Sequence, residues 1–209
     1  MRGHRFFAAI YDWMLAGTED AGLRDMRAEL VGQAEGRTLE LGAGTGLNLA
    51  HYTDAVTELV LTEPDPHMAK RLRDRLGADP PAAGSVKVVE ATAEDLPAED
   101  ASFDTVVSTL VLCTVEDPAR ATAELKRVLR PGGRLLYLEH VRSEDERLES
   151  WQDRLERPWG WFAAGCHPNR PTATTLAAAG FSVEPEEGSL PKAPPLVRPL
   201  IRGRATLSA

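Results

Sequence analysis

Thr38-Leu39-Glu40-Leu41-Gly42-Ala43-Gly44-Thr45-Gly46 is the stretch that decides the fold of this 209-residue chain. Residues 38–41 have the character of a buried strand, and three glycines at alternate positions follow them directly. Glycine at a turn between a strand and a helix lets the backbone approach a ligand closely. The stretch therefore predicts the first strand of an α/β sheet, with a nucleotide-like ligand against the turn.

A second apolar run, residues 58–62, ends in Glu63 about twenty residues further on, and an acid at this spacing suits the hydroxyls of a ribose. The first two strands are thus expected to hold a nucleoside cofactor between them. A solvated strand end is the structural alternative for Glu63, and a surface strand position is the alternative for Glu40.

Along the rest of the chain, segments with the apolar pattern of a strand alternate with segments that have the pattern of a helix. Residues 4–33 are expected to be helical, with a break near Gly17-Thr18. Further strands are predicted at 86–90, 103–111, 134–139, 181–185 and 198–207, and helices at 47–52, 66–76, 118–129, 143–157 and 171–179. Because a helix lies in each crossover between the first five strands, these strands should be parallel and buried on both faces. The proline-rich segment 189–195 is expected to be an ordered loop.

Composition limits the function. The net charge of -8 argues against a general nucleic-acid binder. Cys113 and Cys166, the only cysteines, have no metal-ligand spacing, so we expect no metal site and a cytoplasmic location. No apolar run approaches the ~18 residues that span a bilayer. The N-terminal segment is read as an amphipathic helix, and a weak role at a membrane surface stays open for it.

The glycine spacing favours a sulfonium cofactor over a dinucleotide. The pattern is G-x-G-x-G, not the G-x-G-x-x-G of dinucleotide-binding folds. Glu40 lies inside the motif, where it would repel a pyrophosphate and attract a cationic amino-acid group. After the third strand, Asp95 is placed to accept a hydrogen bond from an adenine amino group, with Glu94 as its substitute. Asp95 could instead only cap a short helix.

With Leu125-Lys126-Arg127-Val128-Leu129-Arg130-Pro131-Gly132-Gly133 as a fourth motif in order, the chain resembles the class I S-adenosylmethionine-dependent methyltransferases. The resemblance implies an α/β, Rossmann-like sheet of seven strands in the order 3-2-1-4-5-7-6, with strand 7 antiparallel and helices on both faces. It implies one domain over 1–209, divided into an N-terminal helical lid (1–33), a cofactor-binding half (34–140) and an acceptor-side half (141–209).

A narrower resemblance is carried by three segments, 108–115, 130–133 and 139–141, and continues in Gly165-Cys166. They are similar to the methyltransferase-like 7 group of thiol methyltransferases. The same outline is similar to bacterial lipid and quinone methyltransferases. A thiol or another small apolar acceptor is therefore expected, and a phospholipid or quinone acceptor at a membrane surface is the alternative.

The resemblance also implies site residues. Glu40 would stabilise the ammonium of S-adenosylmethionine, Glu63 would hold the ribose hydroxyls, and Asp95 would meet the adenine. Gly42, Ala43 and Gly44 would press against the methionine and ribose. Further cofactor contacts are expected from Tyr11, Gly46, Asn48, Pro64, Ala93, Glu94, Thr109 and Leu110. The product would be S-adenosyl-L-homocysteine.

The acceptor side is less defined by the sequence. His140 follows the fifth strand, at the carboxyl edge where α/β sites lie, and is the candidate base or acceptor-orienting residue. Its alternative is a hydrogen-bonded histidine at a strand end. Trp151, Trp159, Trp161 and Phe162 could build an acceptor wall or, as we favour, anchor a helix. A non-catalytic binding module and a nicotinamide-dependent oxidoreductase remain the competing classes, and the oligomeric state is open.

Overall fold

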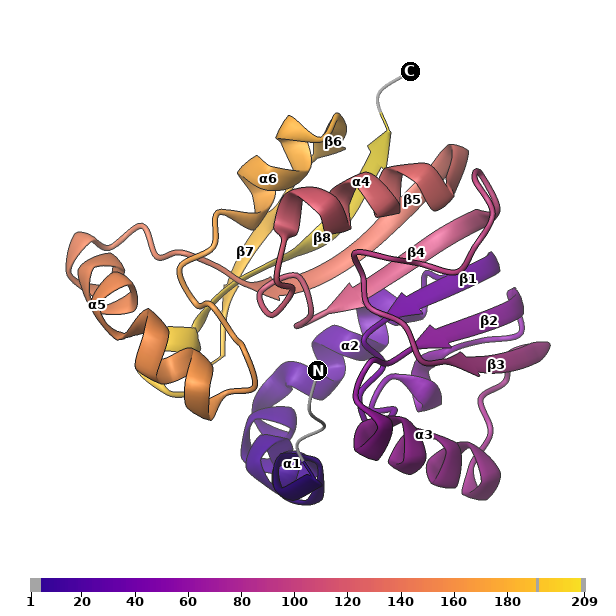
Figure 1. Cartoon of the computed structure of the whole chain (residues 1–209), viewed down its shortest axis with the longest axis horizontal. Coiled ribbons are helices and arrows are strands. Elements are labelled where there is room, and N and C mark those ends of the chain that lie inside the picture. The colour runs from indigo at the N-terminus through magenta and orange to yellow at the C-terminus, as the bar shows by residue number, and fades with distance from the viewer. Residues whose placement is uncertain (1–4, 191, 208–209) are drawn as a thin grey trace.

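The computed structural model describes residues 5–190 and 192–207 and contains a mixed sheet of eight strands (Figure 1). Along the sheet the order is β3-β2-β1-β4-β5-β8-β6, and β7 also pairs with β8. The strands are β1 (Gly36–Leu41), β2 (Val56–Thr62), β3 (Ser85–Val89), β4 (Phe103–Thr109), β5 (Leu129–His140), β6 (Phe181–Val183), β7 (Glu186–Ser189) and β8 (Pro199–Leu207). The first five strands are parallel, and β8 is antiparallel to its neighbours, which confirms the predicted order and direction.

The sheet has one strand more than the seven expected, because β6 and β7 follow one another along the same edge of β8. β6 pairs with the last residues of β8, and β7 pairs with its first residues. The predicted strand 181–185 is therefore interrupted after Val183. Pro185, which has no N–H to donate to a ladder, lies in the gap between the two short strands.

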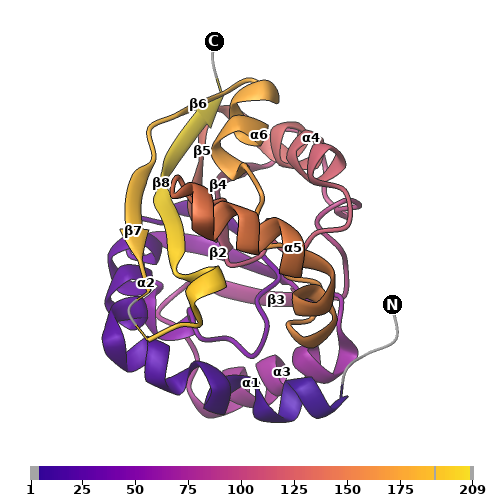
Figure 2. The same ribbon diagram turned by 90° about the vertical axis from the view of Figure 1, so that its left-hand side faces the viewer.

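Helices cover both faces of the sheet (Figures 1 and 2). They are α1 (Arg5–Thr18), α2 (Arg24–Val31), α3 (Pro66–Ala78), α4 (Pro118–Val128), α5 (Glu146–Phe162) and α6 (Thr172–Ala178). In Figure 1, α4 and α6 lie above the sheet, α2 and α3 lie below it, and α5 lies beyond the carboxyl ends of the parallel strands. Among the residues with a described structure, no helix has the length and apolar character needed to cross a membrane.

Local capping explains where two of these helices begin. The Asp65 carboxylate accepts hydrogen bonds from the backbone N–H groups of His67 and Met68, and Pro66 occupies the first helical position of α3. Asp117 and Pro118 repeat the arrangement at α4. An aspartate cap is worth about 1 kcal/mol, and proline at this position loses no helical hydrogen bond.

The alternation of side chains along β5 divides the core into two layers. Leu136 and Leu138 pack on the side of α2 and α3, whereas Leu135 and Tyr137 pack on the side of α4 and α6. All four side chains are fully buried. Burying an aliphatic side chain of this size contributes about 1.5–3 kcal/mol, so a sheet covered on both faces holds the strand ends, and the site that they carry, in fixed positions.

Two predicted boundaries are wrong for identifiable reasons. The N-terminal helical segment, whose expected start at residue 4 lies outside the described residues, runs through Gly17-Thr18 without a break. It bends instead at a kink within Glu19–Leu23, where Gly22 has a non-helical φ of 125°. β4 ends at Thr109 and not at residue 111, because Leu110 has a φ of 61° and turns the chain out of the strand.

Candidate cofactor and acceptor site

The three glycines of the turn after β1 differ in their surroundings, because two are packed against side chains and one faces free space. Gly42, Gly44 and Gly46 have φ angles of 50°, 60° and 86°. A Cβ atom added to Gly42 would lie 2.9 Å from Val111, and one added to Gly46 would lie 2.8 Å from Leu49 and from Leu72. At Gly44 the nearest atom would be 3.9 Å away. Gly44 alone of the three therefore presents free space to a ligand.

A small cavity lies against this turn. It is lined by Tyr11, Arg27, Glu40, Gly42, Ala43, Gly44, Thr45, Leu47, Asn48 and Thr109. The structure thus brings together the predicted residues of the methionine end: Tyr11, Glu40, Gly42, Ala43, Gly44, Asn48 and Thr109. The other predicted cofactor residues lie outside this lining.

Glu40 is a buried acid held by its neighbours. Its side chain is 2% exposed, so the surface alternative is wrong. One carboxylate oxygen accepts a hydrogen bond from Asn48 at 2.8 Å, and the other accepts one from the Tyr52 hydroxyl at 2.7 Å. Burial raises the pKa of Glu40, and these two hydrogen bonds oppose the rise. The result is an oriented carboxyl group inside the cavity wall, suited to a cationic ligand group.

Glu63 is tied to the glycine turn. One oxygen of its carboxylate accepts the Gly44 N–H at 2.8 Å, and the other accepts the Asp65 N–H at 2.8 Å. The residue is buried, so the solvated alternative is also wrong. Burial raises the pKa of Glu63, while the two N–H groups lower it. Each oxygen keeps a lone pair, which is what two ribose hydroxyls would need.

The predicted adenine side follows the ends of β2 and β3. Ala93 is buried, and Pro64 follows Glu63 in a half-buried position. Glu94 accepts the backbone N–H groups of Glu116 and Asp117, at 2.7 and 3.3 Å. Asp95 is exposed, and its side chain makes no hydrogen bond within the part of the chain that the structure describes. Of the two carboxylates, Asp95 is thus the accessible one.

The helix α1 crosses the glycine turn. Asp12 accepts hydrogen bonds from the Thr45 hydroxyl and from Arg75 of α3, the second at 2.6 Å. Tyr11 lines the cavity on the same helix, and burial raises its pKa to about 12. These contacts place the N-terminal helix over the ligand cavity.

Sequence reasoning missed a buried cation at this site. Arg27 of α2 is 3% exposed, and it donates to the Asn48 amide oxygen at 3.1 Å and to the Thr109 hydroxyl at 2.9 Å. Its Nε donates to Glu19 at 3.0 Å, and Glu19 is 7% exposed. The two residues are eight positions apart, which is not a helical pair spacing, so no sequence pattern joined them.

A second missed residue is Glu139, which fixes the loop after β4. Its buried carboxylate accepts hydrogen bonds from the Ser108 hydroxyl at 2.6 Å and from the backbone N–H groups of Val111 and Cys113 at 3.2 and 3.3 Å. Burial raises its pKa against these contacts. These hydrogen bonds therefore fix the loop after β4. The loop carries Leu110, which is half-buried and follows the cavity residue Thr109.

On the acceptor side, His140 ends β5 in a buried position. Burial lowers its pKa to about 4, although a hydrogen bond with the backbone of Val197 opposes the shift. The ring is therefore neutral at pH 7. Its Nδ1 has no hydrogen-bond partner in residues 5–190 and 192–207. This leaves one ring nitrogen able to orient an acceptor, whereas the low pKa makes the ring a weak proton acceptor at pH 7.

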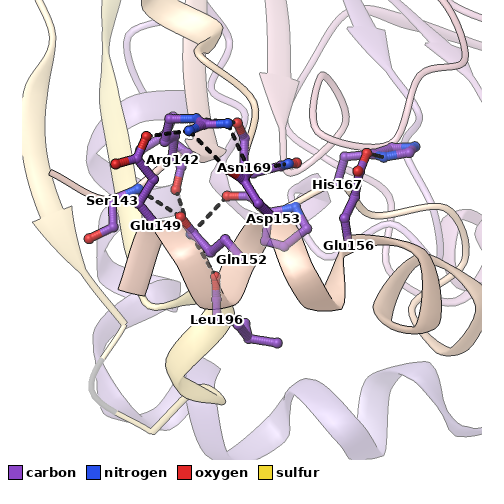
Figure 3. Close-up of polar contacts among 11 residues, drawn as sticks. Arg142, Ser143, Glu149, Gln152, Asp153, Glu156, His167, Asn169 and Leu196 are labelled. Atoms are coloured by element: carbon purple, nitrogen blue, oxygen red, sulfur yellow. Dashed lines mark hydrogen bonds and ion pairs between the residues drawn. The ribbon is translucent and has the colours of Figure 1, made fainter. Parts of the chain in front are cut away.

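The segments beyond β5 are joined through Gln152 of α5 (Figure 3). Its side chain is fully buried, with Oε1 accepting the Ser143 N–H at 2.8 Å. Nε2 lies within 2.9–3.1 Å of the carbonyls of Val141, Pro168 and Leu196. One side chain thus connects the end of β5, the loop after α5 and the loop before β8.

Near the end of α5, two aromatic side chains are exposed, whereas the two cysteines are buried. Trp161 and Phe162 are exposed, Trp161 by 80%, and do not form an enclosed wall. Cys113 and Cys166 are buried with their sulfur atoms 4.0 Å apart, as expected of core residues. His167 contacts Glu156 at 2.8 Å, and Arg170 donates to the carbonyls of Leu112 and Val115.

Comparison with known proteins identifies the family. The methyltransferase domain family matches residues 39–137. The chain is 36% identical over 170 residues to thiol S-methyltransferase TMT1B of Homo sapiens, an alignment that covers 77% of this chain and 69% of that protein. The chain belongs to the class I S-adenosylmethionine-dependent methyltransferases. S-adenosylmethionine is the methyl donor of this family.

Other relatives carry different acceptors in their names. Phosphatidylethanolamine N-methyltransferase of Cereibacter sphaeroides is 30% identical over 160 residues, with 74% of this chain and 76% of that protein covered. A methyltransferase structure from Thermotoga maritima, described as a possible histamine N-methyltransferase, has a TM-score of 0.70 at 25% identity and 98% coverage of both chains. The match to TMT1B of Rattus norvegicus spans 59% of that protein.

The residues present fit the methyl donor of the family. Gly44 leaves room for a close approach, the buried Glu40 offers a negative group to the sulfonium-bearing amino acid, and Glu63 offers two acceptor oxygens. The acid Glu40, in β1 just before the turn, would repel a pyrophosphate.

Proposed function

We propose that this methyltransferase transfers the methyl group of S-adenosylmethionine to a small, apolar acceptor, and that the acceptor atom is a thiol sulfur. The observation that carries the proposal is the cavity at the glycine turn, where the open face of Gly44 lies beside the buried carboxyl group of Glu40. The thiol S-methyltransferases among the relatives support the choice of sulfur.

Methyl transfer is an in-line displacement on a donor that already carries a good leaving group, so the protein contributes mainly position and charge. Glu40 and Asn48 bind the ammonium end of the donor. Glu63 takes the ribose hydroxyls, and Asp95 takes the adenine amino group. Thr109 and Leu110, at the end of β4, lie against the sulfonium and direct the methyl group toward the acceptor side.

The acceptor side of the site excludes water and orients the thiol. A thiol with an ordinary pKa of about 8.5 reacts as the thiolate, so a neighbouring acceptor of its proton raises its reactivity. The neutral imidazole of His140, whose Nδ1 makes no hydrogen bond to a described residue, orients the sulfur, because a pKa of about 4 makes it a weak base for the thiol proton. The N-terminal helix closes the cavity as a lid through the contacts of Asp12. A cytoplasmic location stays a prediction.

The test is a screen that measures release of S-adenosylhomocysteine with aliphatic thiols, aromatic thiols, phenols and amines. We expect turnover with the thiols to exceed that with the matched phenols and amines by at least about tenfold, the equivalent of 1.4 kcal/mol in the barrier. Glu63→Ala should abolish turnover through lost donor binding. Preference for an amine or a phenol would overturn the thiol assignment, and wild-type activity of Glu63→Ala would overturn the site.

A phospholipid or quinone acceptor at a membrane surface is the second candidate, favoured by the similarity to the Cereibacter enzyme and by the exposed Trp13, Trp161 and Phe162. Sedimentation with phosphatidylethanolamine vesicles separates the candidates. Vesicle binding together with methylation of the lipid would favour the second, whereas thiol turnover without vesicle binding favours the first.

A further inference from the structure

The two cysteines face each other in the core, although no step of the proposed methyl transfer uses them. The sulfur atoms of Cys113 and Cys166 are 4.0 Å apart, and both residues are buried. They are the only cysteines of the chain, and 53 positions separate them. A free cysteine is often buried, because it behaves as a small apolar side chain. Burial alone does not require that the only two thiols of a protein lie in contact.

The backbones around the two cysteines are joined as well. The N–H of His167 donates to the carbonyl of Cys113 at 2.8 Å. Arg170, on the same segment, donates to the carbonyls of Leu112 and Val115 on either side of Cys113. The sulfur atoms of a disulfide are about 2.05 Å apart, so these two must approach by about 2 Å. A change of rotamer moves a cysteine sulfur by about 3 Å, so the approach needs no rearrangement of the joined backbones.

Cys166 is the more accessible of the two cysteines. Its side chain is 7% exposed, against 1% for Cys113. It follows a tight turn in which Ala164 has a φ of 49° and Gly165 a φ of 88°, and Ala164 is exposed. The left-handed backbone region is unfavourable for alanine. The turn is therefore the part of the surroundings that opens most readily, and a small reagent reaches Cys166 first.

The two thiols also differ in acidity. The hydrogen bond between the sulfur atoms lowers the pKa of Cys166, although burial opposes the fall. The same hydrogen bond raises the pKa of Cys113. Because the thiolate is the nucleophile in thiol–disulfide exchange, Cys166 is suited to attack a disulfide and Cys113 to react in the second step. The order agrees with the order of exposure.

We propose that Cys113 and Cys166 are a redox-sensitive pair, which a small organic disulfide oxidises to an intramolecular disulfide that arrests methylation of the acceptor. The proposal rests on the proposed function, since the oxidised form of a thiol acceptor is such a disulfide. The Cys166 thiolate attacks one sulfur of the reagent, which releases one thiolate and leaves a mixed disulfide. Cys113 then loses its proton and attacks the Cys166 sulfur, which releases the second thiolate. The two cysteines are oxidised, and the reagent is reduced to two thiols that carry the two cysteine protons.

The disulfide would join two segments on the acceptor side of the sheet. Cys113 follows Leu110 in the loop after β4. Cys166 follows α5, the helix whose Gln152 connects the end of β5 with the loop before β8. A displacement of about 1 Å in a positioning segment can cost on the order of 100-fold in rate. Neither cysteine is among the described residues that line the cavity at the glycine turn, so donor binding should be spared.

Mass spectrometry tests the disulfide directly. The protein is reduced with a phosphine, because a thiol reductant could itself be methylated, and is then treated with hydroxyethyl disulfide. Remaining thiols are blocked with N-ethylmaleimide after denaturation. The wild-type protein should lose two hydrogens, take up no maleimide and yield a cross-linked peptide pair that contains Cys113 and Cys166. Two maleimide adducts, a lasting mixed disulfide or a disulfide between two copies would overturn the proposal.

Turnover and variants test the arrest. With a thiol acceptor, the oxidised wild-type protein should turn over at least about tenfold more slowly and recover with the phosphine. Its Kd for S-adenosylhomocysteine should stay within about twofold. Cys166→Ala should keep its turnover in the presence of the reagent, and Cys113→Ala should stop at a mixed disulfide on Cys166. Should a variant not fold, the mass and the turnover of the wild type decide.

The outcomes separate this proposal from the proposed function. Unchanged turnover of the cross-linked wild-type protein would overturn the arrest. Absence of turnover with any acceptor in the reduced protein would instead overturn the proposed function, because the mass measurement reports the disulfide without any turnover.

Discussion

Substitution of Gly44 by alanine should weaken cofactor binding while the protein stays folded. The added Cβ would find no atom nearer than 3.9 Å, so the structure has room for it. What remains is the cost of a non-glycine residue at a φ of 60°, about 1 kcal/mol. For a chain of this size that corresponds to a fall in melting temperature of about 2–4 °C.

The effect on binding should be larger than the effect on folding. In our proposal the cofactor lies in the space that the new methyl group would occupy, and an extra methyl in a close contact costs about 1–3 kcal/mol. We therefore expect affinity for S-adenosylhomocysteine to fall by about 5- to 150-fold. Titration calorimetry measures the affinity, and thermal unfolding followed by circular dichroism measures the stability.

Gly46→Ala is the matched comparison. Its Cβ would lie 2.8 Å from the side-chain ends of two buried residues, Leu49 and Leu72, at a φ of 86°. Overpacking and backbone strain together should cost about 2–4 kcal/mol of folding free energy, more than at Gly44. The reasoning is refuted if folded Gly44→Ala binds S-adenosylhomocysteine like the wild type, or if it is destabilised as much as Gly46→Ala.

Three further substitutions have defined outcomes. His140→Asn should flatten the dependence of stability on pH. In the wild type the folded-state pKa of about 4 lies below the ordinary 6.5, so up to about 3 kcal/mol of unfolding free energy is lost as the pH falls through this window. A variant whose unfolding free energy, measured in urea, changes between pH 7 and 4 as much as that of the wild type would contradict this. Gln152→Glu should destabilise the protein by about 2–4 kcal/mol, because a carboxylate would face three carbonyls. Glu146→Gln, at an exposed position of α5, should not, and equal melting temperatures for the two variants would exclude the role of Gln152. Glu139→Gln should raise the KM for the acceptor more than the Kd for S-adenosylhomocysteine, since it loosens the loop after β4, and steady-state kinetics with unchanged KM would count against it.

Much of the fold was predictable because its signals are local. Strands buried on both faces are continuous apolar runs, and the Asp-Pro pairs at residues 65–66 and 117–118 mark the helix starts. The same holds for the positions of Gly44 and Glu63 at the ends of β1 and β2, where one hydrogen bond joins them; their roles in binding the cofactor stay predictions. The bend at Gly22 and the split between β6 and β7 were not predictable, because each depends on what the segment packs against.

The sequence by itself determined the parallel sheet, the glycine turn and the two acids that face it, since all are encoded within a few residues of a strand end. Only the tertiary structure decided that Arg27 enters the site and that Glu139 and Gln152 hold its walls. Their partners lie up to 82, 31 and 44 positions away. Periodicity reports whether a side chain is buried, but a hydrogen bond between buried polar groups depends on which segments meet, and the fold of the whole chain decides that.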